Sequence, residues 1–329
     1  MSEAITFDTV GGPEILRVRP WHPAEPKPHE VRLDIEYIGV NRPDLHFRSG
    51  IYPIKPTLPG SRLGIEAVGV IAAVGSEVTG HSVGDRVIAG PIAAQSEHGV
   101  YGDVAIVPAA EIIPAFDMLD PAHNAAAWIA YATAYSGLVH SGGLRSGQHV
   151  LITAASSNVG LAALQVANHV GAIPIAATRS MDKAQRLLDA GAKHVVVGTP
   201  GEISPTVRDL TGGRGVDLVF DAVGGPGFPD TAAAAADDGT VVIYGFFDDQ
   251  PALLPQRWPM KIVGHIDFTM TRNPYRLASV RSFLGDGLAS GALVPTIDRI
   301  FDGLHDVVEA HQHAASGRPF GKVLIGVNR

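Results

Sequence analysis

The sequence predicts an α/β protein of two domains, an irregular and mostly antiparallel β domain and a doubly wound parallel sheet. Its 329 residues are enough for about two domains. Near residue 120 the pattern changes from short β-rich runs between glycines and prolines to strands that alternate with helices. The final segment returns to the first pattern, so we expect the parallel sheet to be an insertion. We predict residues 1–122 and 269–329 for the first domain and 123–268 for the second.

The β-rich domain begins with a predicted strand at 31–38, where apolar and polar side chains alternate as in a half-buried strand. Segments 64–74 and 85–88, each bounded by glycine, are predicted to be further strands. The prolines between 53 and 59 indicate an irregular loop, because proline is excluded from central strands. The C-terminal tail is predicted to add strands at 293–300 and 321–327 and a helix at 304–314.

The parallel-sheet domain contains one strongly periodic helix, at 159–170. Its apolar residues recur at i, i+3, i+4, i+7 and i+8 and so share one face. We predict Asn158 as its N-cap and Gly171 as its end. Strands alternating with helices of this length favour a parallel sheet covered on both faces. The other predicted elements are strands at 149–154, 173–178, 195–197, 216–221 and 240–245 and helices at 182–190 and 232–236.

Composition excludes several classes of protein. Apolar residues make up 46% of the chain and charged residues 18%, which excludes a disordered chain. The net charge of −8 opposes a nucleic-acid partner. The absence of cysteine excludes disulfides, thiolate nucleophiles and cysteine-bound zinc. Because we find no export signal and no apolar run long enough to span a bilayer, we expect a cytoplasmic protein with no membrane association.

The turn after the first parallel strand has features of a dinucleotide site. Such a site needs backbone N–H groups at a helix N-terminus and small residues that let a diphosphate approach. Segment 154–160 (AASSNVG) keeps only the last glycine of the G-x-G-x-x-G pattern. These residues alone fit an ordinary helix cap equally well, but the strand–turn–helix context favours a cofactor. The predicted cofactor-binding residues of this turn are Ser156, Ser157, Asn158, Val159 and Gly160.

The end of the second parallel strand favours NADPH over NADH. A NAD site carries Asp or Glu here to bind the ribose hydroxyls, whereas this chain has Thr178, Arg179 and Ser180, followed by Lys183. Arg179 and Lys183 can pair with a 2′-phosphate, which a carboxylate would repel. The alternative is two solvated cations at a helix start, a position where positive charge is mildly unfavourable.

Motifs over nearly the whole chain, each common singly, occur together in one order. They are GVNRPD at 39–44, RSGIY at 48–52, PGSRLGIEAVGV at 59–70, GDRV at 84–87, YATAY at 131–135, FDAVGG at 220–225 and GKV at 321–323. On these motifs the chain resembles the zinc-independent branch of the medium-chain dehydrogenase/reductase superfamily, the quinone oxidoreductase group that includes zeta-crystallin. The resemblance implies a GroES-like irregular β-barrel catalytic domain, a Rossmann-type cofactor domain and a homodimer.

Departures from the zinc-dependent relatives imply chemistry without a metal. Those relatives have Cys and His where this chain has Asn41 and Ile65. His311 and His313 lie two apart on a predicted helix and so face different directions, which favours a solvated helix surface over a metal site. Hydride transfer to an electron-poor acceptor does not need a Lewis acid. The resemblance implies a quinone or an α,β-unsaturated carbonyl as that acceptor.

Four residues of the first domain are candidates for the catalytic site or its support. We expect Asn41 near the nicotinamide ribose or the substrate oxygen, as a hydrogen-bond donor. Tyr52 can donate a hydrogen bond or a proton to the developing oxyanion, or can form a pocket wall with its hydroxyl in water. Asp44 is a candidate pocket residue, with capping of a helix start as the favoured alternative. Glu66 is interpreted as a buried, paired structural acid.

Later strand ends and the closing segment complete the predicted site. Ligands of such sheets bind beyond the carboxyl ends of the strands. Tyr131 and Thr133 are expected at the cleft where the domains meet, with aromatic core as the plainer alternative for Tyr131. Arg318 and Lys322 are predicted to reach the cofactor, with surface charge as the alternative. The predicted pocket residues are thus Asp44, Tyr131 and Phe247, and the remaining cofactor residues are Thr133, Val223, Gly224, Tyr244, Gly245, Phe246, Arg318 and Lys322.

The sequence therefore predicts an NADPH-dependent, metal-free reductase of small-molecule quinones or enones. Two alternatives stay open. One is a non-zinc, NADP-dependent alcohol or aldehyde dehydrogenase, and the other is a non-catalytic NADPH-binding sensor or structural protein.

Overall fold

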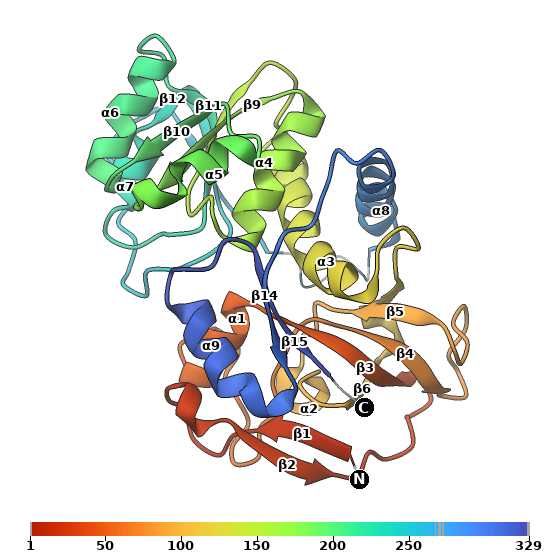
Figure 1. The fold of residues 1–329 in the computed structure, drawn as a ribbon. Helices are drawn as coiled ribbons and strands as arrows, with labels where there is room; N and C mark the ends of the chain where they lie inside the picture. Colours follow the sequence, from red (N-terminus) through yellow and green to blue (C-terminus); the bar gives the residue numbers. More distant parts are fainter. Residues whose placement is uncertain (1, 267, 269–270, 272, 328–329) are drawn as a thin grey trace. The chain divides into compact units, whose positions relative to one another are not determined.

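The computed structural model describes residues 2–266, 268, 271 and 273–327. The chain divides into two compact units, whose elements are labelled in Figure 1. The first unit holds the described residues of 1–129, 268–279 and 295–329, and the second holds those of 130–267 and 280–294. The domain boundaries predicted from the sequence stay a prediction.

The first unit is built on a mostly antiparallel sheet with the strand order β14-β15-β3-β4-β5-β7, in which β6 also pairs with β3. Figure 1 shows the C-terminal strand β15, in blue, beside β3, in red. The C-terminal segment thus joins the sheet of the first domain, as the tail pattern predicts. Its strands, with the separate β1–β2 ribbon, are β1 (Ser2–Thr6), β2 (Arg17–Trp21), β3 (Glu30–Val40), β4 (Ala67–Val74), β5 (Arg86–Ala89), β6 (Val104–Pro108), β7 (Ile112–Pro114), β14 (Ile297–Asp302) and β15 (Lys322–Gly326).

Short helices surround this sheet. The first, α1, begins at a capping box in which Asn41 is the N-cap and Asp44 the third residue, and it ends at Gly50 with φ 76°. The core of the unit is made by inward-facing residues of β3, among them Leu33 and Ile35, which are wholly buried. The helices and 3-10 turns are η1 (Pro13–Ile15), α1 (Arg42–Ser49), α2 (Gln95–His98), η2 (Ala109–Glu111), η6 (Leu304–Asp306) and α9 (Val307–Ala315).

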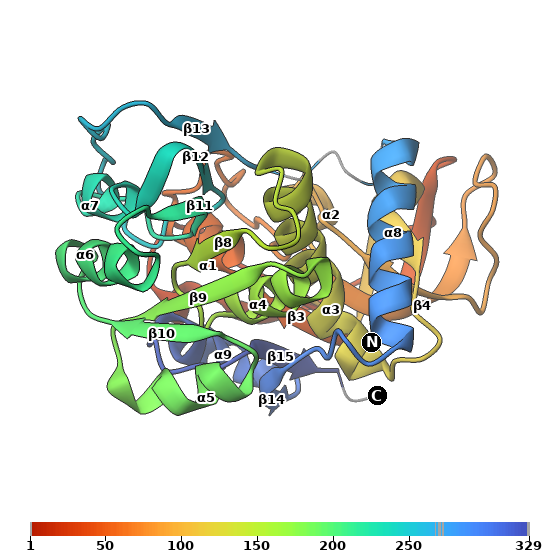
Figure 2. The ribbon, with the colours of Figure 1, turned by 90° about the horizontal axis from the view of Figure 1, so that it is seen from above.

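The second unit is a parallel sheet of six strands in the order β10-β9-β8-β11-β12-β13. Figure 2 shows these strands side by side in this order. The chain runs outward from β8 to β10 and then returns to the other side of β8 with β11, so the order reverses between β8 and β11. In doubly wound sheets a ligand binds at this reversal, beyond the carboxyl ends of the strands. The strands are β8 (His149–Ile152), β9 (Ile173–Thr178), β10 (His194–Val197), β11 (Val216–Asp221), β12 (Ala235–Ile243) and β13 (Lys261–Gly264).

Helices connect these strands or flank them in the sequence. They are η3 (Ser136–Ser141), α4 (Asn158–Val170), η4 (Met181–Lys183), α5 (Ala184–Asp189), α6 (Pro200–Leu210) and α7 (Phe228–Ala232), while α3 (Pro121–Tyr135) and α8 (Pro274–Ala289) each belong partly to both units. In the described part of the chain, every helix is too short or too polar to cross a bilayer.

Two local predictions in the second unit are wrong. The N-cap of α4 is Ser157, not Asn158, because Ser157 has an extended backbone and its hydroxyl accepts from the Gly160 amide at 3.1 Å. The alanine-rich segment 232–236 is not one helix: α7 ends at Ala232 and β12 begins at Ala235, which pairs with Val216. Alanine has the highest helix propensity, but tertiary contacts can override propensity, and here pairing within the sheet decides.

Candidate active site

The backbone of the turn between β8 and α4 lies so close to the first turn of α4 that only glycine fits at position 160. A Cβ atom on Gly160 would lie 2.5 Å from the carbonyl oxygen of Ala154 and 2.7 Å from the Cα of Ala155. Ala154 itself has a left-handed backbone, with φ 45°. This is why Gly160 is the one glycine of the pattern that the sequence keeps. The resulting turn presents the amide groups that open α4 at the carboxyl end of β8.

A positive charge lies against this turn. The Lys183 ammonium donates a hydrogen bond to the Ser156 hydroxyl at 3.0 Å, so residues after β9 and after β8 meet. Thr178 is buried, and its hydroxyl accepts from the Ser180 amide at 3.2 Å. Arg179 is exposed. The structure therefore brings Ser156 and Lys183 together and gives Arg179 no such contact with the turn.

The reversal point of the sheet is tied together by a buried carboxylate. Asp221, at the end of β11, accepts from the Thr153 hydroxyl at 2.7 Å and from the amide of Gly224 at 2.8 Å. Gly224 has φ 64°, which allows the chain to turn directly after the strand. Burial raises the pKa of Asp221, and the Thr153 hydrogen bond opposes that rise. Thr153 and Asp221 position the turns on both sides of the reversal, a role that the sequence reasoning missed although Asp221 lies in the quoted FDAVGG motif.

The turn after β12 adds aromatic side chains. Tyr244 stacks on Phe220, with ring centroids 3.9 Å apart. Its buried hydroxyl faces Ser157 but makes no hydrogen bond of normal geometry among the described residues. Next to it, Phe246 is exposed and lies beside Gly224, and the Phe247 amide donates to the carbonyl of Ala222 at 3.0 Å. Predicted residues from the turns after β8, β11 and β12 are thus brought together.

Of the two α3 residues, Tyr131 fits the aromatic-core alternative, and the role of Thr133 stays a prediction. Tyr131 is 2% exposed, and its hydroxyl donates to Gln165 at 2.8 Å. Its hydrogen-bonding capacity is therefore used inside the core of the second unit. Thr133 is half-buried.

The first unit contains a closed polar network around Glu66. The Lys322 ammonium lies 2.5 Å from Glu66 Oε2 and 2.7 Å from Asn41 Oδ1, and the Ile129 amide donates to Glu66 Oε1 at 2.8 Å. Glu66 and Lys322 are 0% and 1% exposed. The interpretation of Glu66 as a buried, paired acid is confirmed. The surface-charge alternative for Lys322 is wrong, because strand β15 places it in the core. Arg318, in contrast, is exposed, and its side chain donates to the nearby Ser316 hydroxyl.

Asn41 has no amide hydrogen left for a ligand in this arrangement. Its Nδ2 group donates to the carbonyl of Gly39 at 2.9 Å and to Glu66 Oε2 at 3.1 Å, while Lys322 donates to its oxygen. The predicted donation from Asn41 to a substrate or cofactor would require one of these bonds to break. Here Asn41 positions the start of α1 and joins it to the Glu66–Lys322 pair.

The capping alternative for Asp44 is confirmed. Asp44 is wholly buried and accepts from the amide of Asn41 at 2.8 Å, from the amide of Ile65 at 3.2 Å and from the Tyr101 hydroxyl at 3.2 Å. Burial raises the pKa of Asp44 to about 7, against the lowering effects of the Asn41 amide, Lys322 and Tyr101. A carboxyl group enclosed in this way supports α1 from within the unit rather than lining a pocket.

Tyr52 follows α1 and is half-buried. Its ring meets that of Phe268 edge-on, with centroids 6.3 Å apart. Burial raises the pKa of the Tyr52 hydroxyl above its ordinary value, and the nearby Asp44 acts in the same direction. Tyr52 therefore stays protonated at neutral pH and can donate a hydrogen bond. Its catalytic role stays a prediction.

Comparison with known proteins identifies the family. Residues 27–117 match the family model described as an alcohol dehydrogenase GroES-like domain, and residues 158–277 match the model described as a zinc-binding dehydrogenase. A quinone oxidoreductase of Pseudomonas aeruginosa is 30% identical over 99% of both chains. One of Salmonella typhimurium is 39% identical over 72% of this chain and 69% of its own. The chain belongs to the quinone oxidoreductase family.

The fold of this family member also agrees with a solved relative. The structure of the Escherichia coli quinone oxidoreductase complexed with NADPH has a TM-score of 0.90 and 26% identity, over 98% of this chain and 99% of that one. The GroES-like and Rossmann-type domains implied by the sequence motifs are thus confirmed.

The histidines of this quinone oxidoreductase differ from the prediction. His311 is not solvated: it is 0% exposed, its Nε2 lies 3.3 Å from the Tyr101 hydroxyl, and burial lowers its pKa to about 3. His313 is partly buried and bonds Asp298 at 2.6 Å. The burial of His311 could have been predicted from the sequence, because Val307, Ala310 and His311 recur at helical spacing and form the buried face of α9.

The described residues contain one group of possible metal ligands, formed by Glu30, Glu97 and His98. The ammonium of Lys27 lies 2.9 Å from Glu97 and 3.4 Å from Glu30. These carboxylates are therefore already paired with a cation, and the group includes none of the predicted site residues.

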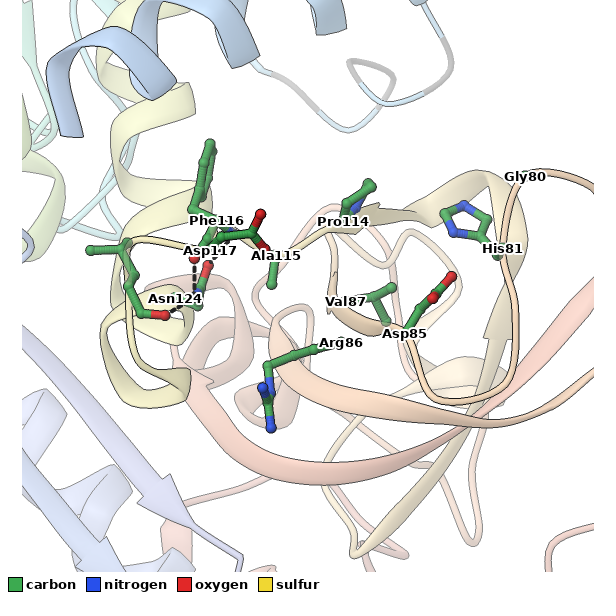
Figure 3. Close-up of a pocket in the computed structure, with 11 residues that line it drawn as sticks. Gly80, His81, Asp85, Arg86, Val87, Pro114, Ala115, Phe116, Asp117 and Asn124 are labelled. Carbon is green, nitrogen blue, oxygen red and sulfur yellow. Dashed lines mark hydrogen bonds between the residues drawn. The ribbon is translucent and has the colours of Figure 1, made fainter. Parts of the chain in front are cut away.

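A pocket of about 370 Å³ lies near β5 and β7 in the first unit, and its lining includes none of the predicted site residues (Figure 3). Asn124 is fully bonded there, accepting from the Phe116 amide at 2.8 Å and donating to the carbonyls of Phe116 and Leu119. Arg86 pairs with Glu36 at 2.8 Å. Because its lining shares no residue with the predicted site, this pocket is distinct from the candidate active site.

Proposed function

We propose that this chain is an NADPH-dependent, zinc-independent reductase that transfers a hydride to a quinone or an α,β-unsaturated carbonyl. The observation that carries the proposal is the contact between Lys183 and Ser156, which puts a cation beside the helix start at the reversal point of the sheet. The family membership and the NADPH complex of the Escherichia coli relative support it.

The second unit has the groups that hold NADPH. The amides at the start of α4 bind the diphosphate, and Gly160 lets the backbone come close enough to do so. Lys183, with Arg179 and Ser180 next to it in the sequence, binds the 2′-phosphate, and no Asp or Glu occupies residues 178–181 to repel it. The buried Tyr244 hydroxyl facing Ser157 is a further polar group for the bound dinucleotide.

The proposed hydride transfer depends on how the acceptor is oriented and on a hydrogen-bond donor for its oxygen. The reduced nicotinamide, when bound, supplies the hydride. Tyr52, protonated at neutral pH because burial raises its pKa, donates a hydrogen bond to the oxygen that becomes negative on the acceptor. The Asn41–Glu66–Lys322 network fixes the start of α1, the helix that precedes Tyr52.

A turnover assay tests the proposal. The purified chain is given NADPH or NADH with a benzoquinone and with an enone, and NADP⁺ with an alcohol, each with and without a metal chelator. We expect turnover with quinone or enone, a preference for NADPH of about tenfold or more, and no effect of the chelator. Turnover of the alcohol would instead indicate a dehydrogenase. Tight NADPH binding without turnover would indicate a sensor or structural protein, and loss of activity with the chelator would indicate a metal enzyme.

We also propose a cytoplasmic homodimer. The strand β13 is at an edge of its sheet, and Leu253, Leu254 and Trp258 of the preceding segment are each more than half exposed. Light scattering of the purified chain is expected to give twice the monomer mass, and Trp258→Ser to shift it toward one monomer. A monomeric wild-type chain at micromolar concentration would contradict the proposal.

A further inference from the structure

The first unit contains a buried arginine with no partner charge, far in sequence from the predicted site residues of the second unit. Arg62 is 8% exposed, and the Trp21 ring covers one face of its guanidinium at 3.9 Å. Among the described residues, no carboxylate oxygen lies within 4 Å of that guanidinium, and its hydrogen bonding is limited to one long bond, from Nη2 to the carbonyl of Val104 at 3.4 Å. Its buried Nε has no partner. A buried charge left in this state is costly.

This arginine lines a pocket. The pocket has a volume of about 260 Å³ and is formed by β1, β2, α2 and the loop after Pro59, with Thr6, Trp21, Arg62 and Ser96 among its residues. Thr6 also has a buried hydroxyl that finds no hydrogen-bond partner in the described structure. Both of these unpartnered atoms, Arg62 Nε and Thr6 Oγ1, are enclosed by protein, so the terminal nitrogens of Arg62 are the part of its guanidinium that is left for a ligand. We call it the Arg62 pocket.

The charges around the Arg62 pocket favour a single negative charge in it. Arg19, on the pocket wall, pairs with Asp8 at 2.5 Å, and Asp8 also accepts from the Gly60 amide at 3.0 Å. That pair is neutral as a whole. Asp103 contributes a negative field at Arg62 without contacting it. Among the described residues, Arg62 has no carboxylate in contact with it, so a monoanion fits beside it, while the nearby Asp103 and Asp8 would repel a dianion.

We infer that the Arg62 pocket binds a small monocarboxylate, held by the terminal nitrogens of the Arg62 guanidinium, with Trp21 behind it. Arginine presents a planar set of donors that matches a carboxylate, and stacking on an aromatic ring fixes its orientation. This ligand site is separate from the proposed reductase function and does not depend on it.

The test is a titration of the purified full-length chain with sodium acetate and with sodium propionate, at constant ionic strength set with sodium chloride. Two signals are followed: tryptophan fluorescence, to which Trp21 contributes with the two other tryptophans, and the melting temperature. We expect a saturable change in both signals with the carboxylates, and a weaker response to phosphate at pH 7.5, where phosphate is mostly a dianion.

Variants assign the response to the pocket. Arg62→Gln is expected to abolish it, and Arg86→Gln, which removes an exposed arginine outside the pocket, to leave it unchanged. If Arg62→Gln does not fold, Arg62→Lys keeps the charge without the planar donors and is expected to weaken binding about tenfold. A response equal to that of chloride, one unchanged in the Arg62 variants, or tighter binding of phosphate than of acetate would each overturn the inference.

Discussion

Two clusters of predicted site residues, one in each unit, use their polar groups in opposite ways. In the first, Asn41, Glu66 and Lys322 satisfy one another inside the core, so their bonds are used for holding the fold. In the second, the groups at the strand ends meet at one edge, where Lys183 contacts Ser156 and the Tyr244 hydroxyl has no regular bond among the described residues. A closed network of hydrogen bonds stabilises the fold and orients neighbouring side chains, whereas an open set of donors at the start of a helix can bind an anion.

The largest expected effect comes from breaking the closed network. Lys322→Met leaves the Glu66 carboxylate buried and unpaired, so we expect the free energy of unfolding to fall by about 3–5 kcal/mol. Urea denaturation measures it. Adding Glu66→Gln removes the stranded charge and is expected to recover part of the loss.

The exposed pair Arg214–Asp217 is the control for that prediction, since its nitrogen and oxygen lie 2.8 Å apart and both residues are more accessible than Lys322 and Glu66. Arg214→Ala should cost less than about 1 kcal/mol. Equal costs for the two substitutions would mean that burial does not distinguish the pairs.

The next effect comes from adding a methyl group to the turn before α4, in the proposed NADPH site. Gly160→Ala places a methyl group 2.5 Å from the Ala154 oxygen, so we expect a loss of about 1–3 kcal/mol in stability and weaker NADPH binding. Calorimetric titration and denaturation measure the two. The matched control is Gly285→Ala in α8, where a Cβ meets nothing within 4 Å and stability should rise slightly. A Gly160→Ala chain that binds NADPH normally would remove the turn from the proposed site.

A smaller effect is expected at the edge of the open site. Lys183→Gln removes the cation beside Ser156, so we expect the Kd for NADPH to rise about tenfold while that for NADH changes little. Arg179→Gln removes the other cation assigned to the 2′-phosphate and should cost less, because the exposed Arg179 side chain lacks the contact with Ser156. If the two variants weaken NADPH binding equally, the contact with Ser156 does not mark the 2′-phosphate site.

The same contrast explains what the sequence could predict. Periodicity and the strand–turn–helix pattern locate α4, its turn and Gly160, because backbone geometry there is local and tied to residue size. The partners of Lys322 and His311 are set by the pairing of β15 with β3 and by the packing of α9, contacts between residues more than 200 positions apart. Residue types indicate that such groups need partners but do not say which partner each one has. Lys322 was therefore expected at the cofactor or the surface, and the structure places it in the core.

A further effect concerns the pH dependence of stability and the enclosed carboxyl of Asp44. Its pKa rises from the ordinary 3.8 to about 7 because it is buried, although Lys322 and the Tyr101 hydroxyl favour its charged form and Glu66 opposes it. Between these values the folded chain keeps a proton that the unfolded chain has lost, so the free energy of unfolding falls as the pH rises from about 4 to about 7. Asp44 can contribute a slope of at most about 1.4 kcal/mol per pH unit. We expect Asp44→Asn to remove that slope and the control Asp189→Asn, on the surface of α5, to keep it. If the stability of Asp44→Asn changes with pH in parallel with that of the wild-type chain over this range, Asp44 titrates at its ordinary pKa in the fold.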